Sequence, residues 1–436
     1  MVSLLLLSFL YLSERIKIGN SRKSFYLLGR IYSVGKILVR KGFVVMNKIP
    51  IAIYLQHYLA PSMTFIYRQL KSVEIKHNLL VICSDRVENR AKFPFEKIFL
   101  KRRNLIRFKK SRYYNKLFGS HSLLSINPRI SLTQTKYFSE ILHKNHVKLI
   151  HAHFGPSGIE ILPIAKDLKI PLVVSFHGYD GSILLKYEGY KQKLKRLFGY
   201  SHVIVPSHYM LNELNERVGN LVNYSIVNYG IPLDDFRYVK RASVKNKVDR
   251  DEKLTFLQVS NFVEKKGHFY TVSAFKELLI FYPNVQLVLV GDGYLKGEIQ
   301  ELVNNLGLNK KVIFPGEVDH KQVSKFMSNA DVFLHHSITS TQGDKEGIPN
   351  VIMEAMATGL PCISTFHAGI PELIKDGING FLVEERNVES YVQKMIKLVD
   401  SSSNFSYEAR DTVESDFNLD HQNEKLIKIY HSLLNS

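Results

Sequence analysis

The stretch GDKEGIPNVIMEAMATGLP, residues 343–361, places two glutamates eight positions apart around one predicted helix. Pro349 suits the first turn of a helix, and Gly359 suits the left-handed position that follows the last turn. At a rise of about 1.5 Å per residue, Glu346 and Glu354 stand roughly 12 Å apart. This distance is too long for two carboxylates that share a proton, and it suits the two ends of one elongated ligand.

The amino end of this helix is predicted to bind an anion. Its first amides, Gly347 to Val351, have no acceptors within the helix and lie at the positive end of the helix dipole. Glu354 lies in the apolar run VIMEAM, where a carboxylate needs a partner. A diphosphate at the amino end would set a sugar beside Glu346 and a ribose beside Glu354. The structural alternative is a buried, capping or salt-bridging Glu354 and an exposed Glu346.

Strand-like and helix-like segments alternate on both sides of this stretch, which predicts an α/β fold with parallel sheets. The strand-like runs before residue 239 are IPIAIYLQ, LLVICS, VKLIHAHF, PLVVSFHG, HVIVPS and NYSIVNYG. Those after residue 253 are KLTFLQVS, VQLVLVGDG, KVIFPGEV, DVFLHHS, PCISTF and GFLVEE. The charged run VKRASVKNKVDRDEK between them has no apolar period. We therefore predict an N-terminal domain at 46–240, a linker at 241–253, a C-terminal domain at 254–415 and a final helix at 416–436.

Length and charge agree with two domains and an anionic partner. A chain of 436 residues exceeds what one hydrophobic core usually supports. The net charge of +19 predicts nucleic acid, acidic lipid or a phosphorylated substrate as partner. Residues 101–116, KRRNLIRFKKSRYYNK, carry eight Lys and Arg with apolar residues between them, which favours an anionic membrane surface. A solvated basic helix is the alternative, and no nucleic-acid motif accompanies the segment.

The cysteines and the N-terminus bear on the compartment. Cys83 and Cys362 stand in apolar strand-like runs without metal-ligand spacing, so we interpret both as buried thiols in a reducing compartment. Residues 1–45 include an apolar stretch that is neither a convincing signal peptide nor a membrane span. A translated upstream stretch before Met46 and an interfacial anchor helix both remain open.

Several motifs at predicted strand ends carry chemistry. In VSNFVEKKGHFY, two lysines at a strand-to-helix junction suit phosphate oxygens, and a solvated lysine pair is the alternative. In LVLVGDGYLKGE, Lys296 stands where a dinucleotide fingerprint needs its third glycine, so a nicotinamide site is a weak interpretation. His177 of HGYD suits either a structural or a cleft-facing role. His151 and His153 share a strand face without a third metal ligand at fitting spacing.

At these residues the chain resembles a known family. EGIPNVIMEA is similar to the E-x7-E motif of the GT-B-fold retaining glycosyltransferases of family 4 (group 1). The stretches HAHFGPSG, VVSFHGYD, IVNYGIPLDDF, VEKKGH, LVLVGDG, FPGEV, MEAMATGLPCISTFHAGIPELI and DGINGFLV follow in the family's order, and the resemblance spans about residues 48–435. The subgroup with GDKEGIP and STFHAGIPE is similar to bacterial exopolysaccharide and capsule enzymes, such as those for colanic acid and amylovoran.

The resemblance implies the GT-B fold, in which two Rossmann-like domains face a cleft and the C-terminal helix at 416–436 returns to the N-terminal domain. Matched position by position, it also implies roles for individual residues. The catalytic residues that it implies are His177, Glu346 and Lys266. The donor-binding residues that it implies are Glu354 at the ribose, the backbone of Gly347, Ile348 and Asn350 at the sugar and diphosphate, Asn261 at the phosphates and Val318 at the base. The acceptor-side candidates are Thr64 and Tyr67.

Two positions depart from the family pattern. Asn261 stands where the family usually has an arginine, and an asparagine brings no charge to oppose a developing diphosphate. Met63 stands where the family's early segment has an acid. A catalytically silent nucleotide-sugar-binding subunit is therefore one alternative function. A GT-B-fold sugar-nucleotide epimerase, which needs no acceptor, is the other.

The function implied is that of a retaining hexosyltransferase in bacterial exopolysaccharide or capsule synthesis. It would move a sugar from a UDP- or GDP-linked donor to a hydroxyl of a saccharide held on a lipid diphosphate. Neither a cofactor nor a metal is expected, because Lys266 and the helix dipole can take the leaving-group charge. The expected location is the cytoplasmic side of the plasma membrane, with peripheral attachment to anionic lipid through residues 101–116 and no nucleic-acid partner.

Overall fold

The computed structural model describes residues 48–60, 63–102, 129–241, 243–403 and 405–435. The predictions for residues 1–45, and for the basic segment beyond Arg102, lie outside the described residues. Within the described part of the chain, no helix is both long and apolar enough to cross a membrane.

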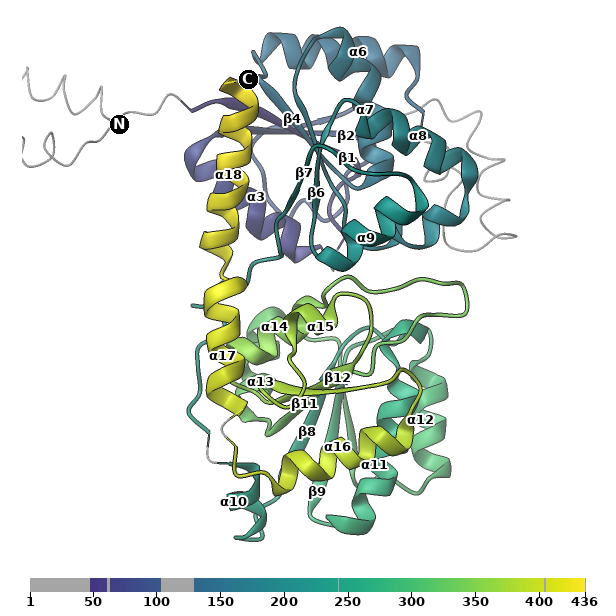
Figure 1. The fold of residues 1–436 in the computed structure, drawn as a ribbon, viewed down its shortest axis with the longest axis vertical. Helices are drawn as coiled ribbons and strands as arrows, with labels where there is room; N and C mark the ends of the chain where they lie inside the picture. Colours follow the sequence, from purple (N-terminus) through teal and green to yellow (C-terminus); the bar gives the residue numbers. More distant parts are fainter. Residues whose placement is uncertain (1–47, 61–62, 103–128, 242, 404, 436) are drawn as a thin grey trace, which may run out of the picture. The chain divides into compact units, whose positions relative to one another are not determined.

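The N-terminal domain is built on a seven-stranded parallel sheet of order β3-β2-β1-β4-β5-β6-β7 (Figure 1). Its strands are β1 (Pro50–His57), β2 (Asn78–Arg86), β3 (Ile98–Leu100), β4 (Leu149–His153), β5 (Leu172–Ser175), β6 (His202–Val205) and β7 (Tyr224–Ile226). Its helices are α3 (Thr64–Lys76), α6 (Leu132–Lys144), α7 (Gly155–Asp167), α8 (Glu188–Phe198) and α9 (His208–Arg217). All five residues of β4 are buried, because helices cover both faces of a parallel sheet.

The C-terminal domain contains a six-stranded parallel sheet of order β10-β9-β8-β11-β12-β13. Its strands are β8 (Leu254–Val259), β9 (Val285–Val290), β10 (Val312–Gly316), β11 (Val332–Leu334), β12 (Cys362–Thr365) and β13 (Gly380–Val383). Its helices are α11 (His268–Phe281), α12 (Lys296–Asn305), α13 (His320–Asn329), α14 (Asn350–Ala357), α15 (Ile370–Leu373), α16 (Val388–Asp400) and α17 (Phe405–Asp416). Every strand-like run of the sequence forms a strand, so the predicted α/β architecture of two parallel-sheet domains is confirmed.

Two local elements were not foreseen. The edge strand β3 has three residues, all half-buried, which is too short a run to show a period. The segment predicted as a charged linker carries a five-residue helix, α10 (Val244–Val248). Ser243 caps this helix, Val244 is buried, and Lys247 forms an ion pair of 2.7 Å with Asp331. One apolar residue and one ion pair therefore attach a charged segment to the C-terminal domain.

The chain ends in helix α18 (Leu419–Asn435), which packs against α3 of the N-terminal domain (Figure 1). Tyr430 on α18 is fully buried, and its hydroxyl lies 2.6 Å from Nδ1 of His151 on β4. The predicted return of the C-terminal helix is thus confirmed. Cys83 and Cys362 are free and buried, and burial raises the pKa of both thiols.

Candidate functional site

The stretch at 343–361 forms the loop before α14, the helix itself and the turn after it. The helix begins at Asn350, and Pro349 directly precedes it in an extended conformation. Gly359 ends it with φ of 72°, as predicted. A Cβ at Gly359 would lie 2.6 Å from Ser406 Oγ, so close packing as well as backbone conformation requires glycine here.

A cleft of about 790 Å³ receives side chains from both domains. Nine of the predicted site residues line it: Thr64, His177, Asn261, Lys266, Glu346, Gly347, Ile348, Asn350 and Glu354. The lining does not include Val318 or Tyr67. Val318 packs at the edge of an apolar core cluster, and the Tyr67 ring packs against Phe93 at 5.1 Å between centroids. The structure therefore brings the donor-side candidates together, except for Val318, with one acceptor-side candidate.

A cluster of opposite charges lies in the loop before α14. Lys266 Nζ is 2.9 Å from Glu346 Oε1, and Lys265 Nζ lies 3.7 Å from the same oxygen and 3.0 Å from Asp344. Burial raises the pKa of Glu346, but Lys266 and Lys265 outweigh it and hold the pKa below its usual range. Glu346 is therefore ionised at neutral pH, with two ammonium groups beside it.

The backbone after the lysines fixes this cluster. Gly267 has φ of 59°, and a Cβ there would lie 1.9 Å from the carbonyl oxygen of His336. Only glycine allows the lysine turn to approach the chain that follows β11 so closely. The sequence pointed to both lysines as a pair, but it gave Lys265 no role of its own.

Glu354 has a partner that the sequence did not reveal. Arg68 on α3 donates to its Oε1 at 3.0 Å, and the two side chains are only 13% and 6% exposed. Burial raises the pKa of Glu354, and the Arg68 guanidinium partly offsets this rise. The salt-bridged Glu354 of the structural alternative is thus present. Glu346, in contrast, is only 12% exposed and not the exposed residue that this alternative expected.

Replacing Arg68 with methionine is expected to destabilise the protein by about 3 kcal/mol, because it leaves the buried carboxylate of Glu354 without its cation. The measurement is the midpoint of urea unfolding. The double variant Arg68→Met/Glu354→Gln is the control, and it is expected to recover part of the loss because no buried charge remains. An unchanged midpoint in the single variant would show that the pair contributes nothing.

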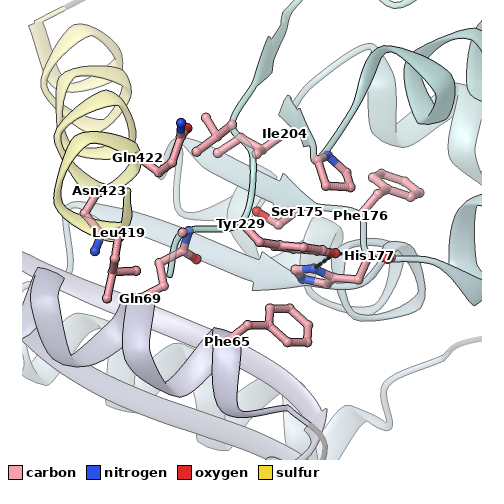
Figure 2. A pocket seen from close by; sticks show the side chains of 13 residues that line it. Phe65, Gln69, Ser175, Phe176, His177, Ile204, Tyr229, Leu419, Gln422 and Asn423 are labelled. Carbon is pink, nitrogen blue, oxygen red and sulfur yellow. Dashed lines mark hydrogen bonds between the residues drawn. The ribbon is translucent and has the colours of Figure 1, made fainter. Parts of the chain in front are cut away.

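The His177 ring lies beside the rings of Phe65 and Tyr229, at 5.3 and 5.9 Å between ring centroids (Figure 2). The Tyr229 hydroxyl donates to the His177 carbonyl at 3.0 Å, so it accepts from the ring Nδ1 at 3.1 Å. The ring Nε2 therefore accepts from Nδ1 of His153 at 3.0 Å. Burial lowers the pKa of His177 well below its usual value. The imidazole is neutral, and protein groups engage both of its nitrogens.

The two histidines of β4 are structural in this arrangement. His151 lies between Tyr430 and Ser175, 2.6 and 2.8 Å away, and its ring stacks on that of His153 at 4.3 Å. Both are fully buried. Among the residues that the structure describes, no group of three or more His, Cys, Asp or Glu side chains could hold a metal ion.

The carbonyl of His177 faces the loop before α14. A Cβ at Gly347 would lie 3.2 Å from this oxygen, so the N-terminal and C-terminal domains approach closely at this point of the cleft. Such an arrangement can hold an extended anionic ligand, with cations and free helix amides at its centre and carboxylates on either side.

Comparison with known proteins agrees with this geometry. Residues 81–235 match the family model described as Glycosyltransferase Family 4, and residues 239–412 match Glycosyl transferases group 1. A Salmonella typhimurium glycosyltransferase named for colanic acid biosynthesis, WcaL, is 28% identical over 65% of this chain and 70% of its own length. The amylovoran biosynthesis glycosyltransferase AmsK of Erwinia amylovora is 27% identical over 69% of this chain and 72% of its own.

Two further proteins extend the comparison. The Escherichia coli UDP-Gal:alpha-D-GlcNAc-diphosphoundecaprenol alpha-1,3-galactosyltransferase is 24% identical over 67% of this chain and 77% of its own length. The crystal structure of Anabaena HepE in complex with UDP and glucose covers 88% of this chain and all of its own, with a TM-score of 0.66 and 17% identity, which establishes the shared fold. Together with the two family models, these similarities show that the chain belongs to the group 1 glycosyltransferases of family 4, with the GT-B fold.

Proposed function

We propose that this glycosyltransferase moves a hexose, with retention, from a nucleoside-diphosphate sugar to a hydroxyl of a saccharide during synthesis of bacterial exopolysaccharide or capsule. The observation that carries the proposal is the cluster of Lys265, Lys266 and Glu346 at the amino end of α14, with Glu354 on the same helix. Cations, helix amides and two carboxylates are the groups that a diphosphate, a sugar and a ribose require. The relatives named for colanic acid and amylovoran synthesis support the pathway class.

Donor binding exchanges partners within the charge cluster. Glu346 forms an ion pair with Lys266 at 2.9 Å, so an entering diphosphate replaces the carboxylate at that ammonium group. The freed carboxylate of Glu346 then accepts hydrogen bonds from hydroxyls of the donor sugar, while the backbone amides of Gly347, Ile348 and Asn350 take phosphate oxygens. Within α14, Arg68 binds Oε1 of Glu354, and we assign Oε2 to the ribose hydroxyls.

The reaction that fits this arrangement is a front-face substitution. The acceptor oxygen forms its bond to the anomeric carbon on the face from which the diphosphate leaves, and the bond from that carbon to the phosphate oxygen breaks. A leaving phosphate oxygen takes the hydroxyl proton, so no protein nucleophile is required. The two lysines and the helix amides stabilise the charge that develops on the diphosphate. His177, neutral and fixed at both nitrogens, shapes the wall beside the sugar and excludes water.

The acceptor that we propose is a saccharide on a lipid diphosphate. The galactosyltransferase relative is named for such an acceptor. The basic residues 101–116 would attach the protein to anionic lipid on the cytoplasmic face of the plasma membrane. Thr64, at the N-terminal side of the cleft, is the acceptor-side residue that we retain. Lys265 supplies a second cation to the cleft that Asn261 also lines, which argues for an active enzyme over a silent subunit.

The test is a thermal-shift and transfer screen against UDP-, GDP- and ADP-sugars, with and without EDTA. One donor is expected to raise the Tm and to be consumed with EDTA present, and NMR of the product is expected to show the anomeric configuration of the donor. Glu354→Gln is expected to weaken binding of the free nucleotide about tenfold, as loss of charge-assisted hydrogen bonds to the ribose predicts. Glu301→Gln, an exposed change on α12, is the control. Inversion of configuration, or epimerised donor without acceptor, would contradict the proposal.

A further inference from the structure

His367 lies in the turn between β12 and α15, in contact with the loop that carries Glu346. Its side chain is 1% exposed, and its Nε2 accepts the backbone amide of Glu346 at 3.0 Å. Its Nδ1 lies 2.6 Å from Oε1 of Glu385. A neutral imidazole has one proton, so a ring that accepts at Nε2 donates at Nδ1. The chain of contacts from Glu385 through His367 to Glu346 therefore has a defined direction.

Glu385 is itself fixed. Its Oε2 accepts from the amide of Thr339 at 2.8 Å and from Arg386 at 3.0 Å. Burial raises the pKa of Glu385, but hydrogen bonds from His367 and Thr339 outweigh it and bring the pKa to about 2. The carboxylate thus stays ionised and can only accept, which keeps the His367 ring in one tautomer.

The backbone of the same turn also contacts the Glu346 loop. The amide of Gly369 donates to the carbonyl of Gly347 at 3.2 Å, and a Cβ at Gly369 would lie 2.8 Å from Cγ1 of Ile348. Ala368, which lies between His367 and Gly369, has φ of 46°, a left-handed conformation that is strained for a non-glycine residue. Such strain persists where surrounding contacts over-determine the backbone, and it is common at functional sites.

We infer that His367 is a positioning residue, which holds the backbone of Glu346 so that its carboxylate meets the sugar of the donor. The inference rests on the proposed function, in which Glu346 contacts that sugar. Lys266 and Lys265 come from a different turn, and the amide of Gly369 holds the Gly347 carbonyl without the His367 side chain, so the phosphate-binding groups do not depend on the His367 ring. The contribution of His367 therefore appears in recognition of the sugar and not in recognition of the nucleotide.

The experiment compares His367→Met with His367→Gln. Glutamine is uncharged and offers an acceptor oxygen and a donor NH2 group, in place of the acceptor and donor nitrogens of the neutral imidazole, whereas methionine fills space without either. His202→Met is the matched control, because it removes one imidazole contact, that of Nε2 with Ser225 Oγ at 2.9 Å, in the other domain. Two quantities are measured for each: hydrogen exchange of the peptide spanning residues 343–350, and the affinities for UDP and for UDP-glucose, with GDP and GDP-mannose as the second pair.

In His367→Met, exchange of the Glu346 amide is expected to accelerate about tenfold or more, because its acceptor is lost. The ratio of the affinity for the sugar nucleotide to the affinity for the free nucleotide is expected to fall about tenfold. The affinity for the free nucleotide itself is expected to stay within about twofold of that of the unmodified protein. His367→Gln and His202→Met are expected to keep both values. Unchanged exchange in His367→Met, or equal losses for nucleotide and sugar nucleotide, would overturn the inference. If no sugar nucleotide of the wider screen binds the unmodified protein, the proposed function fails, and the exchange result still decides whether His367 holds the Glu346 backbone.

Discussion

Replacing Lys266 with methionine is expected to lower kcat for sugar transfer by about 10²–10³-fold, the usual cost of removing one preorganised donor at a developing negative charge. Lys266 is the closest cation to Glu346, at 2.9 Å, and in the proposed reaction it moves to the leaving diphosphate. The measurement is steady-state kinetics with the donor that the screen identifies. Lys266→Arg, which keeps the charge, is the conservative control, and the Tm of each variant separates catalysis from folding.

A second set of variants tests whether Lys265 takes the place of the arginine that the family pattern has where this chain has Asn261. Lys265→Met is expected to lower kcat/KM about tenfold, and Asn261→Arg in that background is expected to restore most of the loss. In the unmodified protein, Asn261→Arg changes little, because Lys265 already supplies the second charge. Independent, additive effects of the two changes would show that Lys265 does not take this role. Full activity in Lys266→Met would contradict the whole assignment of the phosphate site.

The sequence predicted the elements of the site better than the contacts between them. The start of α14, its terminal Gly359 and the lysine turn before Gly267 all follow local rules of backbone conformation and capping, which act over a few residues. The strand-like runs were equally clear, since strands buried on both faces appear as apolar runs. These signals are enough to bring Lys266, Glu346 and Glu354 to one cleft.

The partners of those residues could not be predicted in the same way. Arg68 lies 286 positions from Glu354, and nothing around it distinguishes it from other basic residues of an amphipathic helix. The requirement that a buried carboxylate have a partner was clear, but the sequence does not name the partner. His367 lay within a stretch that matched the family pattern, yet its contact with the Glu346 amide depends on the fold of a turn 21 positions away.

The contacts of the His177 ring also could not be predicted from local patterns, and its catalytic role stays a prediction. A histidine at a strand end that faces a cleft is a reasonable candidate for direct chemistry. In the structure, its two ring nitrogens form hydrogen bonds with His153 of β4 and with Tyr229, which follows β7. Only the packing of these separate elements decides that the ring is fixed and neutral.

Acid is expected to unfold the protein steeply between pH 6.5 and pH 4. Burial lowers the pKa of His153, His268 and His336 to about 3 each. Their pKa in the unfolded chain is about 6.5. Below that pH these histidines therefore bind protons in the unfolded state and remain neutral in the folded state. The stability from these neutral side chains is fully present above pH 6.5 and is lost as pH falls toward 3. At about 1.4 kcal/mol per pH unit, each costs roughly 3 kcal/mol by pH 4.

Together these three losses approach the roughly 5–15 kcal/mol that holds a typical protein folded. Carboxylates with lowered pKa values, such as Glu385 at about 2, lose their stabilising effect only below their ordinary pKa of about 4.5. A fall in Tm that begins near pH 6.5 therefore reports on histidines. Calorimetry at pH 5, in buffers of different ionisation enthalpy, is expected to find about three or more protons taken up on unfolding. His336→Gln keeps an acceptor for the Arg386 amide and is expected to reduce the proton uptake by about one. An uptake below one proton in the unmodified protein would show that these histidines are charged in the folded state.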